Sequence, residues 1–191
     1  DGTLTDTEDI TITVGAVNRP PELGITGNKV VDENALLSFT ISATDPDADS
    51  LTYSANGLPL GASFDSLTQV FTWTPSYDQA GIYTNVHFEV TDGTLTDSED
   101  ITITVNNVNR VPLLNTIGNK AVDENTLLSF AVSATDPDGN SLTYSATSLP
   151  LGTSFDPLTQ VFTWTPNYDQ AGSYANIHFE VTDGTLADSE D

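Results

Sequence analysis

The chain contains the alternating sequence Ile101-Thr102-Ile103-Thr104-Val105, and the same five residues stand at 10–14. Alternation of apolar residues with threonine predicts a β-strand with one face against a core and the other toward solvent. Both copies belong to a longer repeat, because the sequence Asp92-Gly93-Thr94-Leu95 also stands at 1–4 and at 183–186. The period is about 91 residues, which is long enough for each repeat to fold as a domain with its own core.

Further alternating segments lie between turn sequences such as Asp-Pro-Asp and Thr-Asp-Gly, and they include 37–43, 70–74 and 83–90. About seven short strands per repeat and no convincing helix predict an all-β fold of tandem antiparallel seven-stranded β-sandwiches with Greek-key connections. The inward-facing set predicted for the first full repeat comprises Leu37, Phe39, Ile41, Tyr53, Phe64, Phe71, Trp73, Tyr83, Val86, Phe88 and Val90.

The prolines after Arg19 and near Arg110 divide the chain into three parts. Residues 1–17 are expected to be the last strand of a preceding repeat, residues 18–108 a complete sandwich, and residues 109–191 a second sandwich that lacks its own final strand. Two explanations stay open. In the first, the points at which the sequence begins and ends within the repeat are arbitrary. In the second, the leading strand of one chain completes the second sandwich of the next chain by strand addition, which would give a head-to-tail filament.

The composition narrows the range of functions. The chain has 28 acidic residues against 4 Lys and Arg, a net charge of −24, and no cysteine or methionine. Nothing in it could neutralise the phosphates of nucleic acid or of an anionic membrane surface, so neither is expected as a partner. The absence of cysteine suits an oxidising, extracellular location. No apolar run approaches the ~18 residues that span a membrane.

Acidic residues are concentrated at turns. Asp45, Asp47 and Asp49 alternate with other residues in Asp-Pro-Asp-Ala-Asp, and the second repeat has Asp136 and Asp138 at the same place. Alternate carboxylates on a tight turn match the preference of Ca²⁺ for several oxygen ligands. The alternative is that these turns are merely solvated.

A series of motifs recurs in the same order in both repeats: Asp-Glu-Asn, Ala-Thr-Asp-Pro-Asp, Leu-Thr-Tyr-Ser, Trp-Thr-Pro, Tyr-Asp-Gln-Ala-Gly, Val-Thr-Asp-Gly and Val-Asn-Arg. In this order they resemble cadherin-like domains, and in particular the dystroglycan-type, Ig-like branch found in large secreted bacterial proteins and adhesins. The resemblance covers essentially the whole chain. It implies an extracellular structural repeat in which calcium rigidifies the junctions between domains.

The resemblance also assigns calcium ligands. Glu33 matches the family's first-strand glutamate, and Asp78 matches the acid before the penultimate strand. One complete junction is expected to use Glu33, Asp78, Asn107, Asn109, Asp136, Asp138 and Asp183. The receiving half of an earlier junction is expected to use Asn18, Asp45, Asp47 and Asp92. The chain departs from the family at Arg19 and Arg110, where acids are expected, so we expect fewer ions or affinities in the ~10⁻⁴–10⁻³ M range.

Catalytic function is not expected. The chain has no Gly-x-Ser-x-Gly motif and no arrangement of a serine with a histidine base. The two histidines, His87 and His178, occupy equivalent strand positions without a metal-binding cluster. Trp73 and Trp164, with Tyr77 and Tyr168, could stack on sugar rings, which keeps a carbohydrate-binding module and a polysaccharide partner open as an alternative. The other expected partners are neighbouring repeats and, in the strand-exchange alternative, the next chain in a filament.

Overall fold

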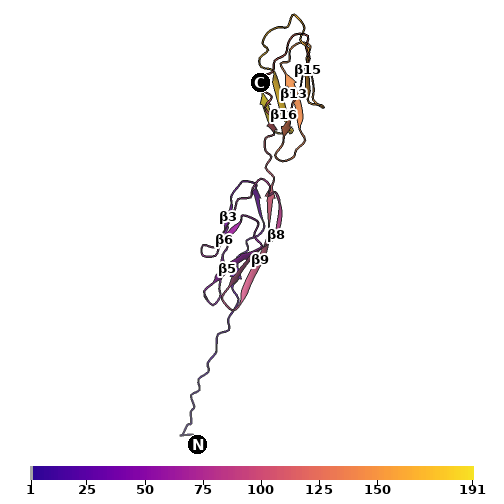
Figure 1. Cartoon of the computed structure of the whole chain (residues 1–191). Helices are drawn as coiled ribbons and strands as arrows, with labels where there is room; N and C mark the ends of the chain where they lie inside the picture. The colour runs from indigo at the N-terminus through magenta and orange to yellow at the C-terminus, as the bar shows by residue number, and fades with distance from the viewer. Residues whose placement is uncertain (1) are drawn as a thin grey trace. The chain divides into compact units, whose positions relative to one another are not determined.

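The computed structural model describes residues 2–191, and within that range it contains β-strands, turns and no helix (Figure 1). The prediction of tandem all-β sandwiches is therefore confirmed. The chain divides into two compact units. The first ends at Val108 and the second begins at Asn109. Asp1, the first residue of the predicted segment 1–17, lies outside the described residues. Residues 2–191 contain no helix with the length and apolar character needed to cross a membrane.

The first unit is a two-sheet sandwich. One sheet has the strand order β2-β9-β8-β5 and the other β3-β7-β6, with a short additional β1-β4 pair. The strands are β1 (Glu22–Leu23), β2 (Lys29–Asp32), β3 (Leu37–Thr40), β4 (Ala43–Thr44), β5 (Thr52–Asn56), β6 (Ser63–Asp65), β7 (Val70–Trp73), β8 (Gly81–Thr91) and β9 (Thr96–Asn106).

The core between these sheets consists of the apolar residues that alternate along the strands. The Phe88 ring meets Phe39, Phe64 and Phe71 edge-on, at centroid distances of 5.6–6.0 Å, an arrangement that aromatic rings favour over face-to-face contact. The predicted inward-facing set is confirmed, with some members buried and the rest packed half-buried against them. The buried residues are Val31, Ile41, Tyr53, Phe71, Trp73, Val86, Phe88, Val90, Ile101, Ile103 and Val105.

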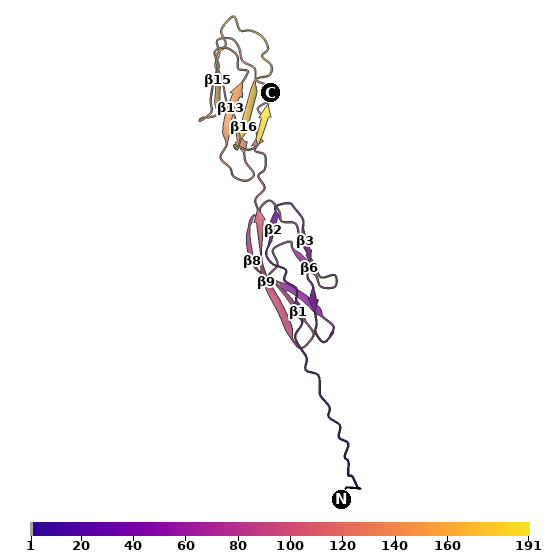
Figure 2. The same ribbon diagram turned by 180° about the vertical axis from the view of Figure 1, so that it is seen from behind.

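The second half of β9 has a partner on each side. It pairs antiparallel with β8 and parallel with β2, where Lys29 lies opposite Ile103 and Asp32 opposite Asn106. This parallel pair departs from the expected antiparallel pattern. Ile101, Ile103 and Val105 are at most 3% exposed, and burial of three such side chains contributes roughly 5–9 kcal/mol. Figure 2 shows β2 alongside β9 from the other side.

The second unit repeats most of this arrangement. Its sheets have the orders β13-β16-β17 and β11-β15-β14, with a short β10-β12 pair. The strands are β10 (Leu113–Leu114), β11 (Leu128–Ala131), β12 (Ala134–Thr135), β13 (Thr143–Thr147), β14 (Ser154–Asp156), β15 (Val161–Trp164), β16 (His178–Thr182) and β17 (Ala187–Glu190).

Two strands of the second unit differ from those of the first. Residues 120–123, which correspond to β2, form no strand, and β16 has five residues where β8 has eleven. Both segments correspond to the strand partners of Ile101–Asn106 in the first unit.

Residues 2–17 form no strand. Ile10, Ile12 and Val14 are 74%, 79% and 88% exposed, whereas Ile101, Ile103 and Val105 of the identical sequence are buried in β9. The same residues therefore occupy two different environments in one chain. The proposed role of residues 1–17 as a strand of a preceding repeat or as a donor strand stays a prediction.

The buried side of β9 provides a test of the sandwich. Ile103→Ala should destabilise the first unit by about 2–5 kcal/mol, because it removes buried methylene groups and leaves a cavity. Native-state hydrogen exchange of the β8 amides Val86–Val90 measures the loss. Thr102→Ala, on the other face of the same strand, is the matched control, and equal effects of the two substitutions would contradict this assignment of faces.

Candidate functional site

Just before the first strand of each sandwich, an asparagine and an arginine bind aspartates of the same unit. In the second unit, Arg110 donates from its backbone N–H to Oδ2 of Asp138 at 2.6 Å and from Nε to Oδ1 at 2.8 Å. Its Nη2 lies 2.7 Å from Oδ1 and also donates to the carbonyl of Pro137 at 2.6 Å. The Asp138 side chain is only 5% exposed. Charge-assisted bonds with this two-point geometry are among the strongest hydrogen bonds in proteins.

The first unit has the same arrangement. Arg19 donates from its backbone N–H to Oδ2 of Asp47 at 2.8 Å, and its Nη2 lies 2.6 Å from Oδ1. The arginines were expected to remove a calcium ligand and add a positive charge. The structure shows in addition that each guanidinium pairs with the second aspartate of Asp-Pro-Asp.

The asparagines next to these arginines hold a second carboxylate. Asn18 Nδ2 donates to Oδ2 of Asp92 at 2.9 Å, and Asn109 Nδ2 donates to Oδ2 of Asp183 at 2.7 Å. We call these two sets the Asn-Arg latches. The first consists of Asn18, Arg19, Asp47 and Asp92, and the second of Asn109, Arg110, Asp138 and Asp183.

The latch carboxylates are held in their charged form. Hydrogen bonding from Arg110 lowers the pKa of Asp138, and Arg19 does the same for Asp47. Backbone N–H donation from Leu186, together with Asn109, lowers the pKa of Asp183. A carboxylate whose pKa is lowered in the folded state contributes stability above its ordinary pKa, and this contribution is lost as the pH falls through the lowered value. The latches are therefore fully formed at neutral pH.

The first aspartate of each Asp-Pro-Asp turn has one oxygen without a partner. Oδ1 of Asp136 accepts the backbone N–H groups of Asp138 and Asn140 at 2.8 and 3.0 Å. Its Oδ2 is buried and has no hydrogen-bond partner among the described residues, and Oδ2 of Asp45 is in the same position. Because a buried carboxylate oxygen is costly when it is left unpaired, a cation or a water molecule would stabilise it.

Glu33 is used differently. Glu33 is 3% exposed. Its Oε1 accepts a hydrogen bond from the backbone N–H of Ala80, and its Oε2 accepts one from the backbone N–H of Val108, each at 2.9 Å. This carboxylate thus fastens the last residue of the first unit to the loop before β8. Each of its two carboxylate oxygens therefore has a backbone donor.

The predicted ligands are divided between the two units. Glu33, Asp78 and Asn107 belong to the first, whereas Asn109, Asp136, Asp138 and Asp183 belong to the second. Within residues 2–191 no group of three or more His, Cys, Asp or Glu side chains is arranged to hold a metal ion. The junction ligand set therefore stays a prediction, and the structure adds the contacts of Arg19 with Asp47 and of Arg110 with Asp138. Their recurrence at one position in both repeats was the sequence signal for them.

The aromatic residues considered for sugar binding differ in exposure. Trp73 and Trp164 are 1% and 7% exposed and belong to the two cores. Tyr168 is 74% exposed, whereas its counterpart Tyr77 is half-buried. The tryptophans are therefore unavailable for stacking on a sugar ring.

Comparison with known proteins gives the following relatives. Chitinase A of Pseudoalteromonas piscicida is 33% identical over 138 residues, which are 70% of this chain and 17% of the chitinase. The serine-rich adhesin for platelets of Staphylococcus aureus (strain N315) is 28% identical over 201 residues, covering 97% of this chain and 8% of the adhesin. The chain thus spans less than a fifth of either relative.

Among solved structures, human protocadherin-24 EC1-2 aligns with a TM-score of 0.50 and 16% identity, over 86% of this chain and 87% of that one. This likeness shows the fold and confirms the cadherin-like resemblance. The Putative Ig domain family matches residues 19–106 and 111–190. Because these matches cover most of both units, the chain belongs to the Putative Ig domain family, as a tandem of two Ig-like repeats.

Proposed function

We propose that the chain is a non-enzymatic structural repeat segment of a long extracellular surface, adhesin or fibre protein. The observation that carries this proposal is that both units use their clustered carboxylates to fasten the polypeptide. Asp138 and Asp183 bind Arg110 and Asn109, and Glu33 binds backbone N–H groups. The similarity to part of a staphylococcal serine-rich adhesin for platelets supports the same function.

The Asn-Arg latches suit such a role. Each fixes the first residues of a unit to two turns that are distant in sequence, and each supplies a positive charge within a strongly acidic protein. An arginine guanidinium stays protonated at any physiological pH. The latch therefore fixes the chain near the start of each sandwich to turns of the same unit.

Calcium fits these residues in part. Oδ2 of Asp45 and of Asp136 is buried and unpaired, which suits a hard cation. Asp47 and Asp138 are already paired with arginine, whose charge disfavours a second cation nearby. We therefore propose weak calcium binding at the Asp45 and Asp136 turns, with the remaining ligands of a rigidified junction as the family resemblance assigns them.

A carbohydrate-binding role is the second candidate. The 33% identity to part of a chitinase favours it, and Tyr168, which is 74% exposed, is an aromatic residue on which a sugar could stack. Binding of the chain to chitin that is lost in Tyr168→Ala would support it, and no retention on chitin would exclude this polymer as a partner.

Calcium titration tests the cation proposal. Isothermal titration should give dissociation constants of about 10⁻⁴–10⁻³ M, and the double variant Asp45→Asn, Asp136→Asn should lose this binding because the unpaired oxygens lose their charge. The matched control is Asp65→Asn, Asp156→Asn, which alters equivalent turn carboxylates that accept backbone N–H groups. Equal loss in both variants, or no binding in the wild type, would contradict the proposal.

The latch is tested through the pKa of Asp138. In Arg110→Ala the pKa of Asp138 should rise toward its ordinary value, because the guanidinium that lowers it is gone. Calcium affinity at this turn should rise as well. The carboxyl-carbon chemical shift of Asp138, followed by NMR from neutral to acidic pH, reports the change. Arg19→Ala is the internal control, since it should shift Asp47 and leave Asp138 unchanged, and an unaltered Asp138 in Arg110→Ala would refute the latch.

A further inference from the structure

The first and last segments of the first unit run side by side in the same direction. Their paired part is the parallel ladder of β2 with β9 (Figure 2). Further contacts extend beyond this ladder at both of its ends, and each of them joins residues 72–75 positions apart in the sequence. Because a nearly constant separation means that the two segments advance in step, residues 18–33 lie parallel to residues 92–108.

Carboxylates of the last segment act as acceptors for the leading segment before β2 begins. Oδ2 of Asp97 accepts the backbone N–H of Leu23 at 2.7 Å. The two carboxylate oxygens of Glu99 accept the backbone N–H groups of Thr26 and Gly27, at 2.7 and 3.0 Å. These bonds are partly buried, and hydrogen bonds to a charged acceptor are roughly twice as strong as those between neutral groups. Side chains thus continue the ladder where the two backbones are not paired.

Further contacts close the other end of the ladder. Asn106 donates from Nδ2 to Oδ1 of Asp32 at 2.8 Å, and its carbonyl accepts the backbone N–H of Glu33 at 3.0 Å. The carboxylate of Glu33 then accepts the backbone N–H of Val108. The contacts between the two segments therefore reach the last residue of the unit.

The second unit has the same side-chain contacts at the same spacing. Leu114 donates its backbone N–H to Oδ2 of Asp188 at 2.8 Å, across 74 positions. The backbone N–H groups of Ile117 and Gly118 donate to the two oxygens of Glu190, at 2.7 and 2.8 Å. The arrangement is therefore a property of the repeat and does not depend on one copy of it.

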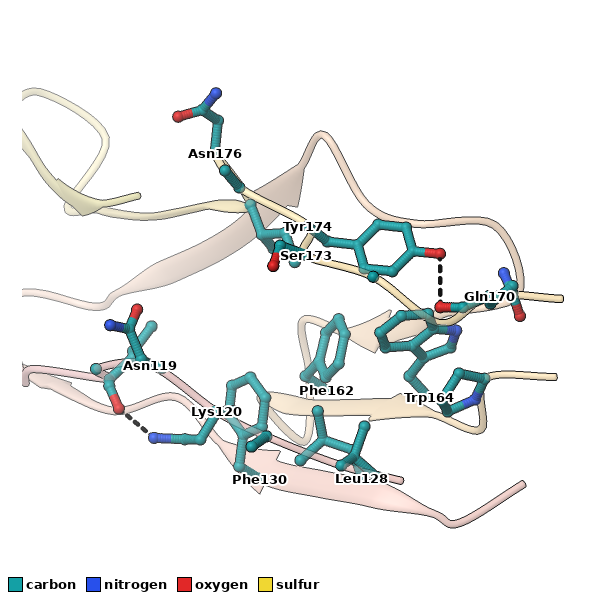
Figure 3. Close-up of a pocket in the computed structure, with 18 of the residues that line it drawn as sticks. Asn119, Lys120, Leu128, Phe130, Phe162, Trp164, Gln170, Ser173, Tyr174 and Asn176 are labelled. Atoms are coloured by element: carbon teal, nitrogen blue, oxygen red, sulfur yellow. Dashed lines mark hydrogen bonds between the residues drawn. The ribbon is translucent and has the colours of Figure 1, made fainter. Parts of the chain in front are cut away.

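The lysine of each unit attaches the leading segment to the opposite sheet. Nζ of Lys29 lies 5.1 Å from the ring centroid of Phe39, a residue of β3 that packs against the core. Lys120 has the same contact with Phe130 at 5.4 Å, and it also donates to the carbonyl of Ile117 (Figure 3). A lysine over an aromatic ring adds an attractive contact of its own, so the leading segment is held from two sides.

A pull along the polypeptide enters the first unit at its leading segment and leaves it at its last segment. Residues 2–17 precede the one, and the second unit follows the other. Because the two segments are parallel, such a pull moves them in opposite directions along their common length. The hydrogen bonds run from one segment to the other, so they are loaded together, and several must break at once before the segments slide.

We propose that residues 18–33 and 92–108 form a shear clamp that carries tension through the first unit. Asp97 and Glu99 extend the clamp beyond the paired strands. The corresponding contacts of the second unit lie between residues 109–118 and 183–190. A structural repeat bears tension when its protein is held at one end and bound at the other, so the clamp rests on the proposed function and adds a mechanical task to it.

Single-molecule pulling on the 191-residue chain tests the clamp, because attachment points can be chosen freely in a protein without cysteine. Handles on Thr7→Cys and Val111→Cys load the two segments from opposite ends, in shear. Handles on Thr7→Cys and Thr94→Cys load them from one end, where Asn18 binds Asp92, and peel them apart. The three substituted residues are exposed. Unfolding in shear should require a several-fold higher force than unfolding by peeling.

Glu99 and its neighbour provide a matched pair of variants. Glu99→Ala removes the acceptor of two backbone N–H groups of the clamp, and it should speed unfolding in shear on the order of 10-fold at a given force. Asp100→Ala removes the next acid of β9, which binds His87 of β8, and it should leave this rate nearly unchanged. Since a general loss of stability would speed unfolding in both geometries alike, the effect of Glu99→Ala should be smaller when the segments are peeled.

Equal unfolding forces in the two geometries would overturn the clamp, and this comparison leaves all of its contacts in place. Equal unfolding rates of Glu99→Ala and Asp100→Ala in shear would overturn the part assigned to the carboxylates. The measurements are made in chelator on the isolated chain, so their outcome depends neither on calcium nor on where the protein is located. A clamp that fails this test leaves the proposed structural repeat standing, and the two proposals are tested separately.

Discussion

The larger sheet of the first unit depends on one strand that is paired on both sides. Ile101–Asn106 completes a four-stranded sheet in the first unit by joining β2 to β8. In the second unit, residues 120–123 and 172–177, which correspond to β2 and to the first part of β8, form no strand. The other strands of that sandwich keep their sheets, because β11, β13 and β15 pair with other strands. In both units the pairs β3-β7 and β11-β15, and β5-β8 and β13-β16, have the same register.

Charge is the second constraint. A net charge of −24 opposes compaction unless the carboxylates find partners, and with only four Lys and Arg most of those partners are backbone N–H groups. Asp183 accepts the N–H groups of Thr185 and Leu186, and Glu190 accepts those of Ile117 and Gly118. These bonds lower the pKa of both carboxyl groups. The acidic residues are therefore part of the turns and loop closures of the fold, in addition to giving it a charged surface.

Alternation predicted which side chains face the core, because in a strand the side-chain period is two whatever the partner. It identified Phe39, Phe71 and Phe88, which contact one another in the structure. It did not predict the parallel pairing of β2 with β9, since the direction of a partner strand leaves no trace in the pattern of one strand. The contact of Arg110 with Asp138 was also missed. The two residues are 28 positions apart, and the family resemblance directed attention to metal ligands at that place.

The latch and the glutamate act on consecutive residues of the chain. Val108 is bound by Glu33 of the first unit, and Asn109 and Arg110 are bound by Asp183 and Asp138 of the second. Each of these three residues is therefore attached by hydrogen bonds to the unit in which its partner lies. A calcium ion at Asp136 would add to an attachment that already exists. Arg110 already binds the neighbouring Asp138 in this turn, so the unpaired Oδ2 of Asp136 is the atom at which such an ion would have to bind.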